Sequence, residues 1–225
     1  MAMTQEQLQV YMEELVARAR KAQKEFEKMY LFESDQKKVD EVVRAIGKKV
    51  CDNGMQLAMD AVAQTGMGDI EGKMGKMFGV ALFTWNYCKG KKSIGVIDDG
   101  VTYPGVRIVA KPMGVIGAVM PSTNPIATIL NNAMCALKCR NSIIIASHPA
   151  SIQVTEAVVG YMREALVEVG APIDLVQCIN AEAACLYYRF FHRPAVRQLH
   201  DRSDHLHRRQ CWFLYAFSFH GSVSG

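Results

Sequence analysis

The sequence predicts an α/β fold in which a helical N-terminal region precedes an incomplete parallel half-sheet. Apolar residues recur at helical spacing over most of the first ninety residues. After Tyr103, short runs rich in β-branched residues alternate with helical segments. Strands and helices that alternate in this way form βαβ units around a parallel sheet. We therefore expect a helical region over residues 1–95, a half-sheet over 96–180 and an irregular tail over 181–225.

The helical region begins with a capping signal. Thr4 is followed three residues later by Gln7, which resembles a capping box. Apolar side chains then mark one face of the first helix: Leu8, Met12, Leu15, Ala19, Ala22 and Phe26. Ser34 can cap a second helix, and the segments 55–65 and 70–88 predict two more. The apolar positions of the second helix are Val39, Val43, Ile46 and Val50.

The half-sheet is predicted from uncharged, β-branched segments. The stretch VRIVAKPMGVIGAVM predicts strands buried on both faces. Strands are further expected at 142–146 and 174–179, and helices at 126–140 and 151–169. This Rossmann-like βαβ order brings ligands to the carboxyl ends of the strands. The loops 121–125 and 147–150 are therefore the candidate binding segments.

Composition excludes several classes of protein. The 225 residues are 50% hydrophobic and 21% charged, which is typical of a soluble globular protein. A net charge of +4 is too mild to favour nucleic acid as a partner. The N-terminus lacks a signal-peptide pattern, and no apolar run reaches the roughly 18 residues of a membrane span. We therefore expect a cytoplasmic protein with no membrane contact.

The seven cysteines do not predict a disulfide framework or a metal site. They are odd in number and widely scattered, which suits a reducing compartment. Cys135 and Cys139 lie four residues apart on a predicted helix. No matching His or Cys pair follows at zinc spacing, so we interpret both as small buried apolar residues and not as a metal or redox pair.

The tail differs abruptly from the rest of the chain. All 14 lysines lie at or before Lys138, whereas residues 181–225 hold six of the twelve arginines and nine of the nineteen aromatics. No sustained periodicity predicts an element there. Three interpretations are open: a basic and aromatic interaction tail, which could bind single-stranded nucleic acid; a His-rich metal site; and an accidental segment from a shifted reading frame. The last is favoured. The metal site is the weakest, because its histidines lack acidic or cysteine partners at ligand spacing.

Two segments carry a specific resemblance. Lys111–Pro125 (KPMGVIGAVMPSTNP) and Ser142–Ser151 (SIIIASHPAS) resemble the aldehyde dehydrogenase superfamily, which has a Pro-x-x-Asn-Pro or Pro-x-Asn loop after the first strand of its dinucleotide domain. Their serine, threonine and histidine positions are similar to the CoA-acylating branch, including the aldehyde half of bifunctional aldehyde-alcohol dehydrogenases. Ala61–Lys73 and Gly170–Ile179 support the match. The resemblance covers about residues 5–180.

This resemblance implies a reaction and a set of site residues. In the family, a cysteine thiolate attacks a small aldehyde, hydride passes to NAD or NADP, and the acyl group is released to CoA. Asn124 would donate a hydrogen bond to the oxyanion. The residues Met120, Pro121, Ser122 and Thr123 would line the nicotinamide side of the cofactor. Ser147, His148 and Pro149 would lie beneath the adenosine ribose.

The residues themselves leave other roles open. Asn124 could close an Asx-type turn before Pro125, and His148 could be a turn residue before Pro149. The family's glycine-rich segment and nucleophilic cysteine are not recognised after Ile179. We therefore expect a truncated member that is inactive alone and forms no family-like homo-oligomer. The alternative is a non-catalytic nucleotide-binding or interaction module that uses the Arg/aromatic tail.

Overall fold

The computed structural model describes residues 4–179 and 217–218. Apart from Phe217–Ser218, the tail interpretations lie outside the described residues. The helices are α1 (Gln5–Met29), α2 (Gln36–Asp52), α3 (Gly54–Thr65), α4 (Ile70–Cys88), α5 (Pro125–Lys138) and α6 (Ile152–Glu168). The strands are β1 (Gly95–Asp99), β2 (Arg107–Ala110), β3 (Val115–Val119), β4 (Ser142–Ala146), β5 (Val176–Cys178) and β6 (Phe217–Ser218). Short 3-10 helices occupy Glu33–Asp35, Pro149–Ser151 and Ile173–Leu175.

The central sheet has the strand order β5-β4-β3-β6 within the described residues. β3, β4 and β5 are parallel, as the sequence predicts, and β6 pairs with β3 in the antiparallel direction. The β3–β4 pairing runs without interruption from Val115↔Ser142 to Val119↔Ala146. Both strands therefore end at the same edge of the sheet.

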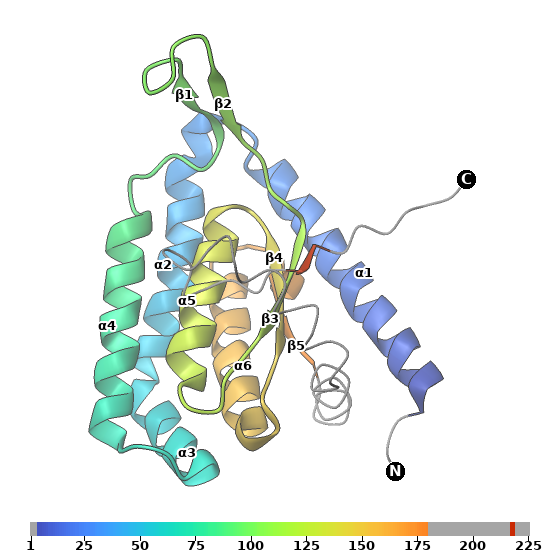
Figure 1. Cartoon of the computed structure of the whole chain (residues 1–225), viewed down its shortest axis with the longest axis vertical. Helices are drawn as coiled ribbons and strands as arrows, with labels where there is room; N and C mark the ends of the chain where they lie inside the picture. The colour runs from blue at the N-terminus through green and yellow to red at the C-terminus, as the bar shows by residue number, and fades with distance from the viewer. Residues whose placement is uncertain (1–3, 180–216, 219–225) are drawn as a thin grey trace, which may run out of the picture.

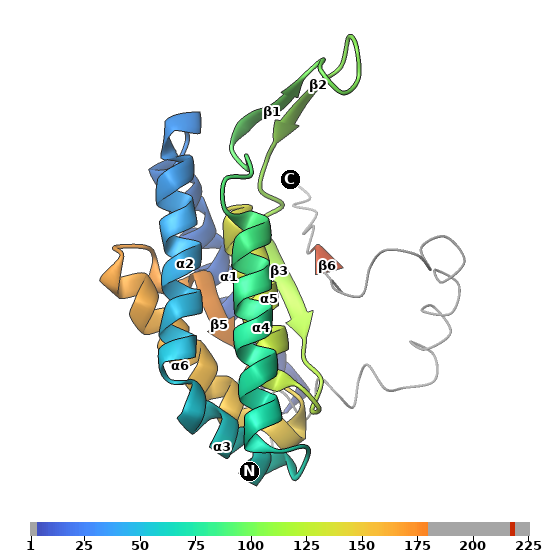
Figure 2. The same cartoon turned by 90° about the vertical axis from the view of Figure 1, so that its left-hand side faces the viewer.

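Helices cover both faces of the sheet (Figures 1 and 2). α1 packs on one face, α5 and α6 pack on the other, and α2 and α4 form an outer layer against α5 and α6. In β4, Ile143 and Ile145 belong to the larger core cluster, whereas Ile144 and Ala146 pack with α1. The prediction that this strand is buried on both faces is confirmed. Among the described helices, none combines the length and apolarity needed to cross a bilayer.

The predicted start of α1 is confirmed, and the predicted cap of α2 is wrong. The Thr4 backbone N–H donates to Gln7 Oε1 at 2.9 Å, and the Gln7 N–H donates to Thr4 Oγ1 at 3.2 Å. α2 begins later than Ser34 implies, because Ser34 lies inside the short 3-10 helix. Asp35 takes the capping role for that turn, and its carboxylate accepts the Phe32 N–H at 3.1 Å.

The segment before β3 forms an exposed hairpin. β1, which the sequence did not predict, pairs with β2 in an antiparallel ribbon that extends away from the helices (Figure 2). Residues along β2 alternate between exposed and half-buried, so the prediction of burial on both faces is wrong there. Its β-branched residues favour a strand, but no layer packs on either side of the ribbon in the described structure. Arg107 pairs across it with Asp99 at 2.7 Å.

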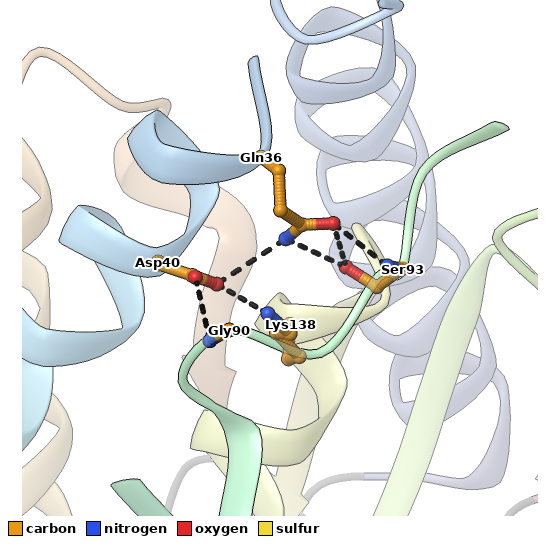
Figure 3. A network of polar contacts seen from close by, with 5 residues as sticks. All are labelled: Gln36, Asp40, Gly90, Ser93 and Lys138. Carbon is orange, nitrogen blue, oxygen red and sulfur yellow. Dashed lines mark hydrogen bonds and ion pairs between the residues drawn. The ribbon is translucent and has the colours of Figure 1, made fainter. Parts of the chain in front are cut away.

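A polar network joins α2, α5 and the segment that leaves α4 (Figure 3). The Asp40 carboxylate pairs with the Lys138 ammonium, and both side chains are largely buried. The same carboxylate accepts the Gln36 amide at 3.2 Å and the Gly90 backbone N–H at 3.3 Å. Gln36 in turn accepts the Ser93 N–H at 2.7 Å. The network therefore fixes the end of α4 against the two helices beside it.

Replacing Asp40 by alanine should destabilise the fold by about 3–5 kcal/mol, because Lys138 would remain buried without its partner. Urea denaturation measures the change in unfolding free energy. The control is Asp52→Ala, which removes the exposed Lys48–Asp52 pair and should cost less than about 1 kcal/mol. Equal losses for the two variants would show that the buried network does not hold these helices together.

Candidate functional site

The two candidate loops lie side by side at the carboxyl edge of the parallel strands. The in-register pairing of Val119 with Ala146 ends both strands at one level. The Met120 N–H then donates to the Ala146 carbonyl at 2.9 Å, which extends the contact into the first loop. The structure thus brings the predicted loops 121–125 and 147–150 together at the edge where parallel sheets bind ligands.

Asn124 occupies the N-cap position of α5, directly before Pro125. Its backbone carbonyl accepts the Thr128 N–H at 3.3 Å, which starts the helix. Its side chain makes no capping hydrogen bond, so the Asx-type turn is not observed. The amide is half-buried and lies at the end of the helix where the unpaired backbone N–H groups carry partial positive charge.

Asn124 lines a cleft of about 220 Å³ between α4 and α5. Thr84 in this cleft donates its hydroxyl to Asn131 Oδ1 at 2.9 Å, so those two polar groups satisfy each other. None of the described lining residues is charged. They are Gly79, Val80, Phe83, Thr84, Asn124, Ala127, Thr128 and Asn131. The cleft therefore presents an amide donor beside a largely apolar wall.

Lys73 supports the loop from the first turn of α4. Its side chain is 5% exposed, and its ammonium donates to the Thr123 backbone carbonyl at 2.5 Å. No carboxylate pairs with it among the described residues. Burial, and then repulsion by Lys76, lowers the pKa of the Lys73 ammonium. The family resemblance included Lys73 in the segment 61–73 but implied no role for it. The Thr123 carbonyl becomes its partner only through tertiary packing, which the sequence pattern does not show.

The other predicted residues of the first loop are divided between the core and the surface. The Met120 side chain is buried in the main core cluster. Pro121 and Thr123 are exposed, and Ser122 is half-buried. Met120 can therefore face a ligand only through its backbone, whereas the three residues that follow it reach solvent.

In the second loop, His148 has a structural role. Its Nδ1 accepts the Ala150 N–H at 3.0 Å and caps the short 3-10 helix that begins at Pro149. This geometry matches the interpretation of His148 as a turn residue. The neighbouring Ser147 hydroxyl is buried and has no hydrogen-bond partner among the described residues. A polar oxygen thus stands unpaired at the carboxyl end of β4.

The described cysteines lie outside the cleft that holds Asn124. They are Cys51, Cys88, Cys135, Cys139 and Cys178. The interpretation of Cys135 and Cys139 as buried apolar residues is wrong for Cys139, which is exposed, and holds only in part for Cys135, which is half-buried. No group of three metal-binding side chains suitable for an ion occurs within residues 4–179 and 217–218.

Comparison with known proteins identifies the family. The model of the aldehyde dehydrogenase family matches residues 1–200. A succinate-semialdehyde dehydrogenase (acetylating) from Clostridium kluyveri is 37% identical over 196 residues, covering 87% of this chain and 40% of that enzyme. An acetylating aldehyde dehydrogenase from Geobacillus thermoglucosidasius superposes with a TM-score of 0.70 at 32% identity, covering 76% of this chain and 37% of that chain.

A further solved structure is relevant to the chemistry. Propionaldehyde dehydrogenase from Rhodopseudomonas palustris, with bound CoA and an acylated cysteine, has a TM-score of 0.57 at 26% identity and covers 82% of this chain and 40% of that one. The chain thus spans about 40% of the length of these relatives. On the family match and these similarities, the chain belongs to the aldehyde dehydrogenase family, and its relatives include CoA-acylating members.

Proposed function

We propose that this chain provides the oxyanion-binding and dinucleotide-facing part of an NAD(P)-dependent, CoA-acylating aldehyde dehydrogenase. The complete reaction converts an aldehyde, CoA and NAD(P)⁺ into an acyl-CoA and NAD(P)H. The observation that carries the proposal is the position of Asn124, which lines the cleft at the N-terminus of α5 and whose side chain makes no capping hydrogen bond there.

The position of Asn124 suits a group that binds developing negative charge. When a nucleophile adds to an aldehyde carbonyl, charge accumulates on the oxygen. The Asn124 amide can donate to that oxygen without breaking an existing hydrogen bond. The N-terminus of α5 and the ammonium of Lys73, which is bonded to the neighbouring residue, add a favourable field. A preorganised donor of this kind typically lowers the barrier by about 3 kcal/mol.

The cleft also suits the hydrocarbon part of an aldehyde. Phe83, Val80 and Ala127 give it apolar walls, and its described residues carry no charge. Water is displaced favourably from such a surface, which strengthens the hydrogen bond at the carbonyl end. This arrangement would orient the aldehyde with its oxygen toward Asn124.

The edge formed by the two loops fits a dinucleotide. The unpaired hydroxyl of Ser147 could bond to a ribose or phosphate oxygen after a small local rearrangement, since it is buried. Ser122 and Thr123 add hydroxyl groups on the neighbouring loop. Neither loop carries a lysine or arginine, so recognition would depend on hydrogen bonds and not on fixed charge. When bound, NAD(P)⁺ supplies the hydride acceptor.

The nucleophile is not part of the described site. None of the five described cysteines lines the cleft, and an oxyanion donor without a nucleophile does not form a complete catalytic centre. We therefore propose that this chain holds one half of the chemistry and does not turn over by itself.

The purified chain should produce no NADH or NADPH from aldehyde and CoA, as followed by absorbance of the reduced nicotinamide. A matched acylating dehydrogenase serves as the positive control for the assay. Turnover by this chain that disappears in the Asn124→Ala variant would contradict the proposal, because it would show that the chain carries its own nucleophile.

The oxyanion role can be tested in a chimaera in which residues 1–179 replace the matching part of the Clostridium kluyveri enzyme. Asn124→Ala should lower kcat by about 100-fold or more, with little change in the KM for CoA. Asn131→Ala is the matched control, because its amide lines the same cleft but already bonds within the protein. A chimaera whose activity depends on Asn131 and not on Asn124 would refute the assignment.

Lys73→Met should loosen the loop that carries Asn124, because the hydrogen bond to the Thr123 carbonyl is lost. The overall stability should change by only about 1 kcal/mol, since burying an ammonium that has no carboxylate partner is itself costly. Hydrogen exchange of a peptide covering residues 121–128 measures the loosening, with the exposed Lys76→Met as control. Unchanged exchange in this peptide would mean that Lys73 does not position the loop.

A further inference from the structure

Beyond the cleft, α4 and α5 each carry a cysteine at the same level of the structure. The two helices lie side by side and run in the same direction (Figure 1). The hydrogen bond from Thr84 to Asn131 fixes their relative register. Cys88 follows Thr84 by four residues, and Cys135 follows Asn131 by four residues, so each lies about one helical turn further along. The same register therefore places Cys88 of α4 at the level of Cys135 of α5, on two helices that pack against each other.

The electrostatics of the two thiols agree with this placement. A hydrogen bond between Cys135 and Cys88 lowers the pKa of Cys88 to about 7; burial opposes the shift, and Lys138 reinforces it. The same hydrogen bond and burial raise the pKa of the Cys135 thiol. One sulfur is thus favoured as a thiolate, while its neighbour keeps its proton.

Charged groups from three segments surround Cys88. Lys138 of α5 and Lys91, which follows α4, favour the thiolate, whereas Asp40 of α2 opposes it. Asp40 and Lys138 belong to the network of Figure 3, which holds them close to the end of α4. The positive groups outnumber the single carboxylate among these neighbours. A thiolate at this position is therefore compatible with its surroundings.

The pair is more suited to thiol chemistry than to metal binding. No triad of ligand side chains suited to an ion is found in the described part of the chain. Cys88 is buried, with 5% of its surface exposed, and Cys135 is half-buried, so solvent reaches the pair on the Cys135 side. A low-pKa thiol next to a second thiol is the arrangement in which an oxidised sulfur is resolved as a disulfide.

We propose that Cys88 and Cys135 form a reversible oxidation site in which a hydroperoxide drives a disulfide between α4 and α5. The Cys88 thiolate attacks the peroxide, the O–O bond breaks, and Cys88 becomes a sulfenic acid as hydroxide leaves and is protonated. The Cys135 sulfur then attacks the Cys88 sulfur, the S–O bond breaks, and water leaves. With hydrogen peroxide, the two thiols lose two electrons and two protons, and the peroxide becomes two molecules of water. A dithiol reductant reverses the change.

The disulfide would tie together the two helices that enclose the cleft. Without oxidation, the polar contact between Thr84 and Asn131 and the packing of the two helices join them at this level. A covalent link one turn further along would restrict their separation. The site therefore offers a way for an oxidant to stiffen this part of the fold.

The test treats the reduced chain of 225 residues with hydrogen peroxide, blocks the remaining thiols and maps the peptides by mass spectrometry. The expected product is a Cys88–Cys135 cross-link that a dithiol removes. Cys135→Ser should abolish the cross-link and leave a Cys88 sulfenic acid that dimedone traps. Cys139→Ser is the matched control, because it removes the thiol of the C-cap residue of α5 and should leave the cross-link intact.

A second readout separates chemistry from packing. The rate of alkylation of Cys88 should be half-maximal near pH 7, and this midpoint should move to higher pH in Cys135→Ala, which removes the hydrogen-bond donor. Circular dichroism and urea midpoints of the serine and alanine variants show whether they remain folded. The absence of a cross-link, or a cross-link to Cys139, Cys185 or Cys211 instead, would overturn the proposal. Oxidation of Cys178 as fast as that of Cys88 in the folded protein would overturn it as well.

Discussion

The structure depends on the parallel, in-register pairing of β3 with β4. This pairing aligns Val119 with Ala146, and the Met120 N–H continues it into the loop. Because both strands stop at one level, the segments that follow them must leave the sheet together. A shift of one residue would exchange the faces that Ile143 and Ile144 present to the two core clusters. The packing of α1, α5 and α6 on the sheet therefore stabilises the β3–β4 register, which positions the two loops of the site.

From this register, the position of Asn124 follows. The loop after β3 crosses the sheet edge and enters α5, so the residue before Pro125 lies at a helix N-terminus. Lys73 reaches the same loop from α4 and holds the carbonyl next to Asn124. α4 also provides one wall of the cleft. The helical N-terminal region is thus part of the site and not only a cover for the sheet.

Local patterns predicted much of this fold. Three patterns predicted their elements: the capping pair Thr4 and Gln7, the helical period of apolar residues, and the SIIIA strand. Each depends on contacts between residues near in sequence or on a uniformly apolar environment. The burial predicted for β2 was wrong because β-branched residues favour a strand whether or not another layer covers it. Ser34 failed as a cap because Asp35 forms a competing turn with Phe32. Which of two neighbouring polar side chains caps a helix depends on the local backbone geometry, and the spacing of residues in the sequence does not specify that geometry.

The site was predictable in outline only. The order of strands and helices indicated which loops would meet, and the resemblance indicated Asn124. The roles of Lys73 and of Cys88 and Cys135 depend on how α4 packs, which no local pattern records. The most direct test of the account is a titration of the full chain with NAD⁺, followed by backbone amide NMR. Saturable shifts at Ser122–Asn124 together with Ser147–His148 are predicted. No shift there, or shifts confined to the surface between α2 and α6, would contradict the account.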